Sequence, residues 1–381
     1  MKKQYSIALG FVNLLFALAI ASCSKNSSTP PSSNNNNNNN LSIGFISTVA
    51  GNGSNTYNGD SLATLAGMDP YSVCIDTAGN LYIADSWNNR IRKVFPNGKI
   101  TTIAGNGKGG FSGDGGQATA AQLNWPEGIC LDKNGNLYIA DYLNNRVRKV
   151  STNGIISTVA GTSNIILGNG DGGLASSATL SGPYGLCNDK LGNLFIADYY
   201  DHRIRKVSTT GIITTYAGST KTSFSGDGGL ATAAGFFYPY GICMDTSGNL
   251  YISDDFDHRI RKVSSNGIIS TISGTGQLGF MGDGGSATNA QFEFPEGLCL
   301  DAAGNLYITD KGNDRIRMIS PDGKIKTVAG AGLVIVSKLG DGGLATDAEI
   351  LGPKGVCTDA AGNYLYIADQ ANHLVRKVRL K

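Results

Sequence analysis

The sequence predicts an all-β fold, a six-bladed β-propeller built from four-stranded antiparallel blades. Three observations support this prediction. One unit recurs six times along the chain, with equivalent arginines such as Arg90, Arg146 and Arg203 spaced 56 and 57 residues apart. Each unit contains four short β-rich stretches separated by glycine turns. The chain has 53 glycines and only 16% charged side chains, a composition that argues against helical bundles and coiled coils.

The repeated stretch Asn-Leu-Tyr-Ile-Ala-Asp marks the second strand of each unit. It occurs in segments 80–94, 136–150, 193–207, 249–263, 305–319 and 363–378. In the second unit the expected strands are 128–132, 136–141, 146–150 and 155–160. An Asn-Gly pair at Asn134 and Gly135 favours a tight hairpin between the first two strands. Six such sheets placed radially bury their faces against one another and leave only short edges.

The two ends of the repeat region predict a closed ring. Residues 44–50 resemble a fourth strand, whereas the last unit has only its first three strands before Lys381. We therefore expect the N-terminal strand to complete the sixth blade. An open array of six sheets would instead leave an unpaired edge at each end.

The N-terminal segment predicts export and lipid attachment. Lys2 and Lys3 precede an apolar stretch at 6–22, which is typical of a secretory signal peptide. Ile-Ala-Ser before Cys23 matches the bacterial lipobox, so we expect residues 1–22 to be a lipoprotein signal peptide. An ordinary signal cleaved nearby is the alternative. Residues 23–43 would then be the lipidated cysteine and an Asn/Ser/Pro-rich tether, and 44–381 the propeller. The expected location is the bacterial cell envelope, either periplasmic or at the surface, anchored to a membrane.

These repeats resemble the NHL repeat family, on the motifs Pro-x-Gly-Ile-Cys-x-Asp, Gly-Asn-Leu-Tyr-Ile-Ala-Asp and Asn-x-Arg-Ile-Arg. The Gly-Asp-Gly-Gly-x-Ala-Thr connection resembles NHL-like propellers of secreted bacterial proteins and of teneurins. The resemblance implies a propeller used mainly for binding, although some related propellers are lyases or lactonases. Two units depart from the pattern: Ser72 stands where the others have glycine, and Leu374 replaces the repeat arginine.

The Asp-x-x-Asn-x-Arg motif is interpreted as scaffold, because residues needed equally in every blade more often hold blades together than bind one ligand. A tight turn uses the aspartate, and we expect the neighbouring arginine to pair with its carboxylate. Six functional sites are the alternative. The motif residues are Asp85, Arg90, Asp141, Arg146, Asp198, Arg203, Asp254, Arg259, Asp310 and Arg315.

No cofactor or metal site is predicted, with calcium as the weaker alternative. The six repeat cysteines lie too far apart for disulfides in this architecture, and His202, His258 and His373 fall in different blades. In the Gly-Asp-Gly-Gly loops, Asp114 is expected to cap a helical turn at 118–123. One carboxylate per loop is few against the six to eight oxygens that calcium takes.

The residues that differ between blades are expected to carry the function. One of them lies between the repeat proline and glycine of each unit, at the channel mouth. Together with aromatic residues before the first strand and after the second, they form the predicted ligand-binding face: Tyr71, Trp87, Trp125, Glu127, Tyr142, Tyr184, Tyr199, Tyr200, Tyr240, Phe256, Glu296 and Lys354. Aromatic rings stack on sugars and anchor peptides equally well.

The function predicted from these residues is that of a membrane-anchored, non-catalytic and monomeric propeller that binds a protein, a peptide or a glycan. Nucleic acid is not expected, because the mouth offers mainly glutamate and the chain's formal net charge is only +2. Two alternatives remain open. One is an enzyme of the lactonase or lyase type that uses Glu127 and Glu296 or a metal at the mouth, and the other is a structural envelope module.

Overall fold

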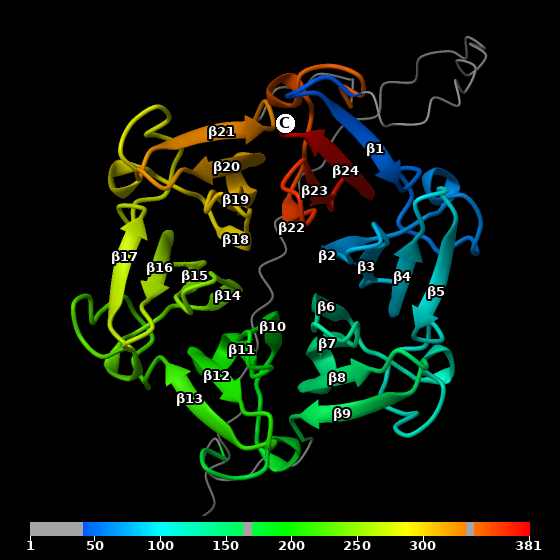
Figure 1. The fold of residues 1–381 in the computed structure, drawn as a ribbon, viewed down its shortest axis with the longest axis horizontal. Helices are drawn as coiled ribbons and strands as arrows, with labels where there is room; N and C mark the ends of the chain where they lie inside the picture. The colour runs from blue at the N-terminus through cyan, green and yellow to red at the C-terminus, as the bar shows by residue number, and fades with distance from the viewer. Residues whose placement is uncertain (1–40, 163–169, 333–338) are drawn as a thin grey trace, which may run out of the picture. The chain divides into compact units, whose positions relative to one another are not determined.

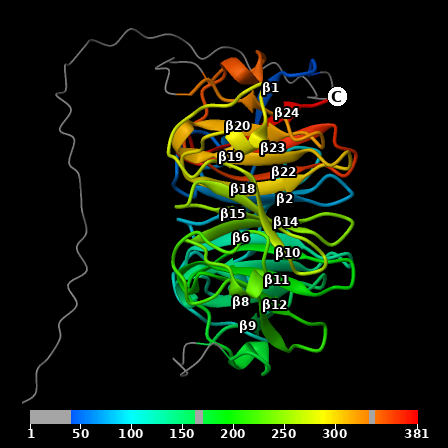
Figure 2. The ribbon, with the colours of Figure 1, turned by 90° about the vertical axis from the view of Figure 1, so that its left-hand side faces the viewer.

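The repeated units fold as six antiparallel four-stranded sheets around a central axis, which confirms the predicted six-bladed β-propeller (Figure 1). The computed structural model describes residues 41–162, 170–332 and 339–381. The predicted signal peptide, Cys23 and nearly all of the tether lie outside these residues. Seen from the side, the propeller unit Leu41–Lys381 is a flattened disc (Figure 2).

Each blade has its first strand next to the axis and its fourth strand at the rim. Blades 1, 2 and 3 consist of β2 (Pro70–Ile75), β3 (Leu81–Asp85), β4 (Arg90–Val94) and β5 (Ile100–Ala104); β6 (Pro126–Leu131), β7 (Leu137–Asp141), β8 (Arg146–Val150) and β9 (Ile156–Ala160); and β10 (Pro183–Asn188), β11 (Leu194–Asp198), β12 (Arg203–Val207) and β13 (Ile213–Ala217). Blades 4 and 5 consist of β14 (Pro239–Met244), β15 (Leu250–Asp254), β16 (Arg259–Val263) and β17 (Ile269–Ser273); and β18 (Pro295–Leu300), β19 (Leu306–Asp310), β20 (Arg315–Ile319) and β21 (Ile325–Ala329).

Blade 6 closes the ring as the sequence predicts. It contains β22 (Pro353–Thr358), β23 (Tyr364–Asp369) and β24 (Leu374–Arg379), and its fourth strand is the N-terminal β1 (Ile46–Ala50). Strand β1 runs antiparallel to β24, with Ile46 opposite Val378. The seam extends one residue further, because the Arg379 N–H donates a hydrogen bond to the Phe45 carbonyl (3.1 Å).

The first strand of each blade begins with an irregularity that matters for the site. In blade 2, Pro126 lies opposite Asp141 and Ile129 lies opposite Ile139, so Glu127 and Gly128 together face the single residue between them. This is a β-bulge, which bends a strand and re-aims its side chains. The first strand therefore starts at the proline, two residues earlier than the sequence suggested.

Short 3-10 turns occupy two of the connections. In the long connection between blades they are η2 (Ala63–Leu65), η3 (Ala118–Ala120), η5 (Ala175–Ser177), η7 (Ala231–Ala233), η8 (Ala287–Asn289) and η10 (Ala345–Asp347). Between the second and third strands they are η4 (Tyr142–Asn144), η6 (Tyr199–Asp201) and η9 (Lys311–Asn313). Across the described ranges, the structure contains no helix with the length and apolar character needed to cross a membrane.

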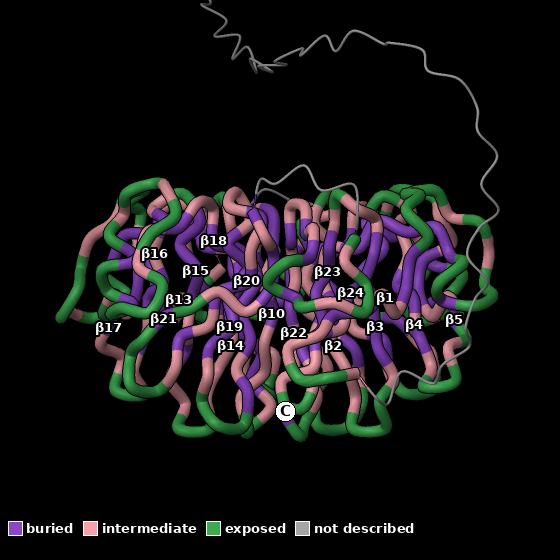
Figure 3. Tube along the Cα trace, turned by 90° about the horizontal axis from the view of Figure 1, so that it is seen from above, coloured by how far each residue is buried: buried purple, intermediate pink, exposed green. Residues whose placement is uncertain are grey.

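The hydrophobic core lies between neighbouring blades, because each sheet buries both of its faces. One cluster joins Ile91 and Ala104 of blade 1 to Ile139 and Val150 of blade 2. Figure 3 shows buried strands between exposed loops. The repeat cysteines pack against these clusters as free thiols among the described residues, and burial raises the pKa of the Cys130 thiol, as it does for its equivalents.

Candidate functional site

The bulge of each first strand places one side chain at the mouth of the central channel. We call these six residues the mouth ring: Tyr71, Glu127, Tyr184, Tyr240, Glu296 and Lys354. Glycine follows the ring residue in blades 2 to 6 for a steric reason. A Cβ at Gly128 would lie 2.0 Å from the Tyr184 carbonyl oxygen, and one at Gly185 would lie 2.3 Å from that of Tyr240. The glycines thus let the inner strands approach closely and hold the ring together.

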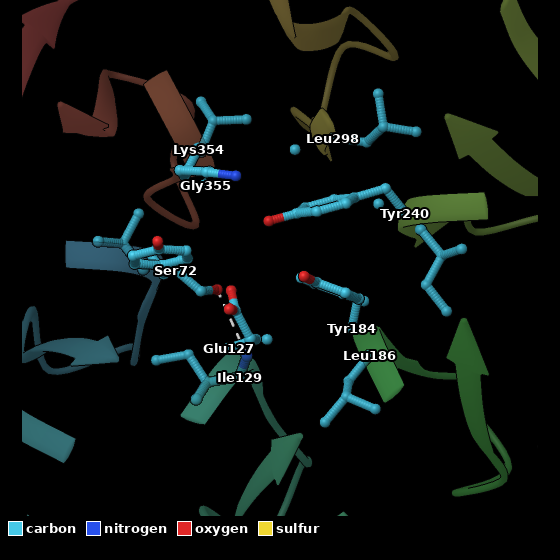
Figure 4. A pocket seen from close by; sticks show the side chains of 17 residues that line it. Ser72, Glu127, Ile129, Tyr184, Leu186, Tyr240, Leu298, Lys354 and Gly355 are labelled. Carbon is cyan, nitrogen blue, oxygen red and sulfur yellow. Dashed lines mark hydrogen bonds between the residues drawn. The ribbon is translucent and has the colours of Figure 1, made fainter. Parts of the chain in front are cut away.

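Ser72, the departure in blade 1, has a specific partner in the same layer. Its hydroxyl oxygen accepts a hydrogen bond from the Ile129 N–H of blade 2 at 3.3 Å (Figure 4). Blade 1 therefore keeps contact with blade 2 through a side chain at the position where the other blades have glycine.

The ring surrounds a cavity of about 80 Å³. Five of its six members line the cavity, and Figure 4 shows the Lys354 ammonium, the Tyr184 and Tyr240 hydroxyls and the Glu127 carboxylate pointing toward its centre. Pockets that hold a drug-sized ligand measure about 300–1,000 Å³. A ligand larger than a few atoms must therefore bind above the ring, with only a narrow part of it entering the channel.

The two ring glutamates differ sharply in their electrostatic partners. Glu296 is neutralised by two lysines, with the Nζ atoms of Lys311 and Lys354 each 2.9 Å from one of its oxygens. No basic nitrogen of the described chain lies within ion-pair distance of Glu127, and its buried Oε2 has no hydrogen-bond partner there. Burial raises the pKa of Glu127 well above its usual range, and the charge of Glu296 adds to this effect. Both glutamates are only 2–3% exposed, so they are not part of an open face as expected from the sequence.

The charges of the two glutamates shift the pKa values of Lys354 and of a ring tyrosine. Burial opposes the charged form of Lys354, but Glu296 and Glu127 outweigh that effect and raise its pKa. Burial, with the charge of Glu127, raises the pKa of Tyr71 to about 12. The ammonium of Lys354 lies 5.1 Å from the ring centroid of Tyr71 and 5.3 Å from that of Tyr240, within cation–π range.

A second ring of side chains follows the repeat aspartate in each blade. Its tyrosines, Tyr142 and Tyr199, belong to the predicted binding face, whereas Lys311 and Asp255 have no role in that prediction. Lys311 reaches Glu296, as described above, and Tyr199 donates a long hydrogen bond to Asp255 (3.4 Å). Burial and the nearby Glu296 raise the pKa of Asp255 to about 8. This second ring can be found from the sequence, because its members are the variable residues directly after each repeat aspartate.

Aromatic side chains lie beside the mouth ring in two clusters, one of Trp87 and Trp125 and one that runs from Tyr142 to Phe294. Trp87 packs edge-on against Trp125 with ring centroids 5.4 Å apart, and Tyr199 stacks on Tyr238 at 4.7 Å. Trp87, Tyr200 and Phe256 are 56%, 50% and 42% exposed, so both clusters present rings to solvent. We call this set the aromatic arc: Trp87, Trp125, Tyr142, Tyr199, Tyr200, Phe237, Tyr238, Phe256 and Phe294. It contains every aromatic residue predicted for the binding face outside the ring, and Phe237, Tyr238 and Phe294 in addition.

Three residues of the arc have left-handed backbone torsions. Trp125, Tyr238 and Phe294 have φ of 55°, 69° and 52°. The equivalent residues in blades 3 and 6 are Gly182 and Gly352, the residue type that adopts this conformation without steric cost. A side chain there costs about 1–2 kcal/mol. Aromatic residues kept at this cost indicate a role beyond folding, since such outliers cluster at binding sites.

The three histidines belong to the contacts between blades. Nδ1 of His202 accepts a hydrogen bond from the Tyr238 N–H at 3.4 Å, and Nδ1 of His258 accepts one from the Phe294 N–H at 3.3 Å. Asn89 does the same for Trp125. Among the described residues, no cluster of three or more His, Cys, Asp or Glu side chains is arranged to hold a metal ion.

The repeat aspartates pair with a different arginine from the one expected. Asp85 forms its ion pair with Arg92 (3.3 Å), the second arginine of Arg-Ile-Arg, and not with Arg90. Arg90 instead lies over the ring of Tyr57 at 4.0 Å and bonds backbone carbonyls. The same pairing recurs in blades 2 to 5: Asp141–Arg148, Asp198–Arg205, Asp254–Arg261 and Asp310–Arg317, while Arg146, Arg203, Arg259 and Arg315 lie outside it. The sixth unit could have indicated this pairing from the sequence alone. It has Leu374 in place of the first arginine but keeps the second, Arg376.

The loop aspartates also have a partner other than the one expected. Asp114 caps no helix, since the N-cap residue of η3 is Gln117 and no side chain forms a capping hydrogen bond there. Its carboxylate bonds Arg148 (2.7 Å) and the Thr158 hydroxyl (2.7 Å). The capping prediction is wrong because Arg148 reaches the loop from the third strand and takes that carboxylate. The carboxylate considered for calcium is thus engaged within the protein.

The fold and the ring define the class of protein, a closed β-propeller with blade-specific residues at its channel mouth. The family model of the teneurin NHL domain matches residues 106–169 and 220–281, and that of the NHL repeat matches 68–94 and 292–317. These matches confirm the resemblance to NHL repeats that the sequence motifs indicated.

Curated relatives share the repeat region with this chain. SUPPRESSOR OF QUENCHING 1, chloroplastic, of Arabidopsis thaliana is 27% identical over 72% of the chain, and Teneurin-4 of Mus musculus is 27% identical over 82%. The chain spans only 27% and 12% of the length of these two relatives. The remaining parts of these two relatives lie outside the matched region.

Solved structures share the fold. An auxiliary nutrient binding protein from Bacteroides ovatus has a TM-score of 0.64 and 17% identity, covering 87% of this chain and 75% of that one. Virginiamycin B lyase from Staphylococcus aureus has a TM-score of 0.50 and 16% identity, covering 82% and 96%. One of these neighbours is described as binding and the other as catalytic, so fold similarity alone does not separate the two functions.

Proposed function

We propose that this protein is a membrane-anchored, non-catalytic binding module of the bacterial cell envelope, which holds a protein, peptide or glycan ligand on its aromatic arc. The observation that carries the proposal is the combination of exposed rings at Trp87, Tyr200 and Phe256 with aromatic side chains held at left-handed torsions. The solved neighbour described as a nutrient binding protein supports a binding role for this fold.

Binding is favoured over catalysis by the state of the two ring glutamates. A paired-carboxylate mechanism needs both groups free to exchange protons. Glu296 is closed off by its ion pairs with Lys311 and Lys354. The cavity of about 80 Å³ is also too small to enclose a whole small-molecule substrate beside Glu127.

Membrane attachment rests on the lipobox ahead of Cys23. Metabolic labelling with a fatty-acid analogue is expected to tag the native chain and not Cys23→Ala. Equal labelling of the two proteins, or export of both in soluble form, would remove the anchor from the proposal.

The arc is tested by screening residues 41–381, which form the compact unit by themselves, on glycan and peptide arrays. The double variant Trp87→Ala, Tyr200→Ala is expected to lose at least tenfold in affinity for any ligand found, because exposed aromatic anchors dominate such interfaces. Leu191→Ala is the matched control, since this residue is 76% exposed in the hairpin between β10 and β11, away from the arc. Unchanged affinity in the double variant would favour a structural envelope module.

A further inference from the structure

The cavity inside the mouth ring contains a buried carboxyl group with which no basic side chain of the described residues forms an ion pair. Glu127 is 3% exposed, its carboxylate points into the cavity, and its Oε2 has no hydrogen-bond partner among the described residues (Figure 4). A buried carboxylate without a partner is costly, because it loses water and gains nothing in return. A cationic group that enters the cavity would supply the missing partner.

Glu296, the other glutamate of the mouth ring, differs from Glu127 because it forms ion pairs with lysine side chains. It faces two ammonium groups at 2.9 Å, so its charge is more than compensated. Lys354 points into the cavity but uses both oxygens of Glu296, at 2.9 and 3.0 Å. Lys354 therefore leaves Glu127 without an ion pair, although both side chains line the same cavity.

The walls of the cavity are suited to an organic cation. Tyr71, Tyr184 and Tyr240 line it, and rings of this kind attract a cation at about 6 Å or less from the ring centroid. The protein already uses this attraction, because the Lys354 ammonium lies 5.1 and 5.3 Å from the centroids of Tyr71 and Tyr240. Tyr184 is left without such a cation among the described residues, and Figure 4 shows its hydroxyl and the Glu127 carboxylate both pointing into the cavity.

The size of the cavity selects the shape of the cation. A volume of about 80 Å³ holds an extended methylene chain with a charged tip. It is far below the volume of about 300 Å³ or more at which whole small molecules are enclosed, and a pyranose ring would remain outside it. We infer that the mouth ring is a socket for a lysine or arginine side chain of a peptide or protein ligand, with Glu127 as its counter-ion and Tyr184 and Tyr240 as its walls. This inference rests on the proposed binding function and narrows its ligand to a basic peptide segment lying across the aromatic arc.

Calorimetric titration of residues 41–381 tests the socket with four small probes. These are Nα-acetyl-lysine methylamide, Nα-acetyl-norleucine methylamide, glucosamine and acetate. The lysine probe is expected to bind at least tenfold more tightly than the norleucine probe, which has a similar shape without the charge. Stronger binding of acetate would overturn the socket, because it would make Lys354 an anion site. Glucosamine that binds as tightly as the lysine probe would overturn the choice of a peptide side chain.

The variant Glu127→Gln keeps the shape of the side chain and removes its charge. It is expected to weaken the lysine probe at least tenfold, whereas Tyr184→Phe, which keeps the ring, is expected to stay within about threefold. Glu293→Gln is the matched control, because Glu293 precedes the first strand of blade 5 outside the ring, and a change below twofold is expected there. Equal affinity in the wild type and in Glu127→Gln would refute the socket.

Thermal unfolding separates loss of the socket from loss of the fold. The lysine probe is expected to raise the melting temperature of the wild type and of Tyr184→Phe, but not of Glu127→Gln. A Glu127→Gln protein that still gains the same stabilisation refutes the inference independently of the affinities. The proposed function fails separately: an array ligand that depends on Trp87 and Tyr200 but is indifferent to Glu127→Gln removes the socket and leaves the arc.

Discussion

The aspartate–arginine pairs within the blades and the mouth ring are built from residues at fixed positions of the same repeat, yet they differ in what varies between blades. The pair of Asp85 and Arg92 recurs in all six blades, with each arginine fully buried. The mouth ring has a tyrosine in three blades, a glutamate in two and a lysine in one. A residue that is the same in every blade therefore marks what each blade needs to fold. Residues that differ from blade to blade around the axis instead create an asymmetric surface for a single ligand.

The largest effect is expected from breaking one buried pair. Arg148→Met leaves Asp141 and Asp114 without their cation, and uncompensated burial of that kind costs about 3–5 kcal/mol. Unfolding in denaturant measures the loss. Lys149→Met, at the half-buried neighbouring position, is the control and should change the free energy of unfolding by about 0.5 kcal/mol or less. A loss below about 1 kcal/mol in Arg148→Met would show that the pairs do not stabilise the scaffold.

A smaller effect is expected where the ring joins the scaffold. Gly128→Ala places a Cβ 2.0 Å from the Tyr184 carbonyl oxygen, so the inner strands must move apart. Overpacking of this kind costs about 1–3 kcal/mol. Ser72→Ala, in the blade that already has a side chain there, is expected to cost less. If the two variants are equally stable by chemical denaturation, close approach of the inner strands is not what the repeat glycine provides.

The histidine contacts between blades give a pH dependence. Burial lowers the pKa of His202 and of His258 below the value of about 6.5 that they take in the unfolded chain. The unfolded state therefore binds protons first, and the contribution of these residues to stability is lost as the pH falls below that value. The double variant His202→Asn, His258→Asn uses the residue of blades 1 and 2 and should flatten this part of the profile. Unfolding free energies at pH 5 and 7.5 measure the difference, and identical profiles would contradict the assignment.

The smallest stability effect is expected on the arc itself. Trp87→Ala removes a ring that is more than half exposed, so the free energy of unfolding should change by about 0.5 kcal/mol or less. Affinity for a ligand found on the arrays should fall about tenfold in the same variant. If Trp87→Ala is strongly destabilised but keeps its affinity, Trp87 belongs to the scaffold and not to the binding surface.

The sequence was sufficient for the blade count, the closing strand and the membership of the mouth ring, because an internal repeat aligns equivalent positions without any structure. It was not sufficient for the contacts between positions. Arg92 lies only two residues beyond Arg90, and nothing in the motif tells the two apart, so the nearer arginine was expected to pair with Asp85. Arg148 lies 34 residues from Asp114, so a helix cap was expected there instead. The neutralisation of Glu296 by Lys311 was missed for the same reason, since it joins the mouth ring to a loop after the second strand.

The seam between β1 and β24 has a consequence for the order in which this protein assembles. These two strands come from opposite extremes of the propeller, so the disc cannot seal until its last stretch has been synthesised. Until then, β1 and β23 lack the strand that lies between them, and pairing across so long a span of sequence is slow. Closure by β1 and β24 also couples the stability of all six blades. No blade can separate from its neighbours unless the hydrogen bonds between these two strands break.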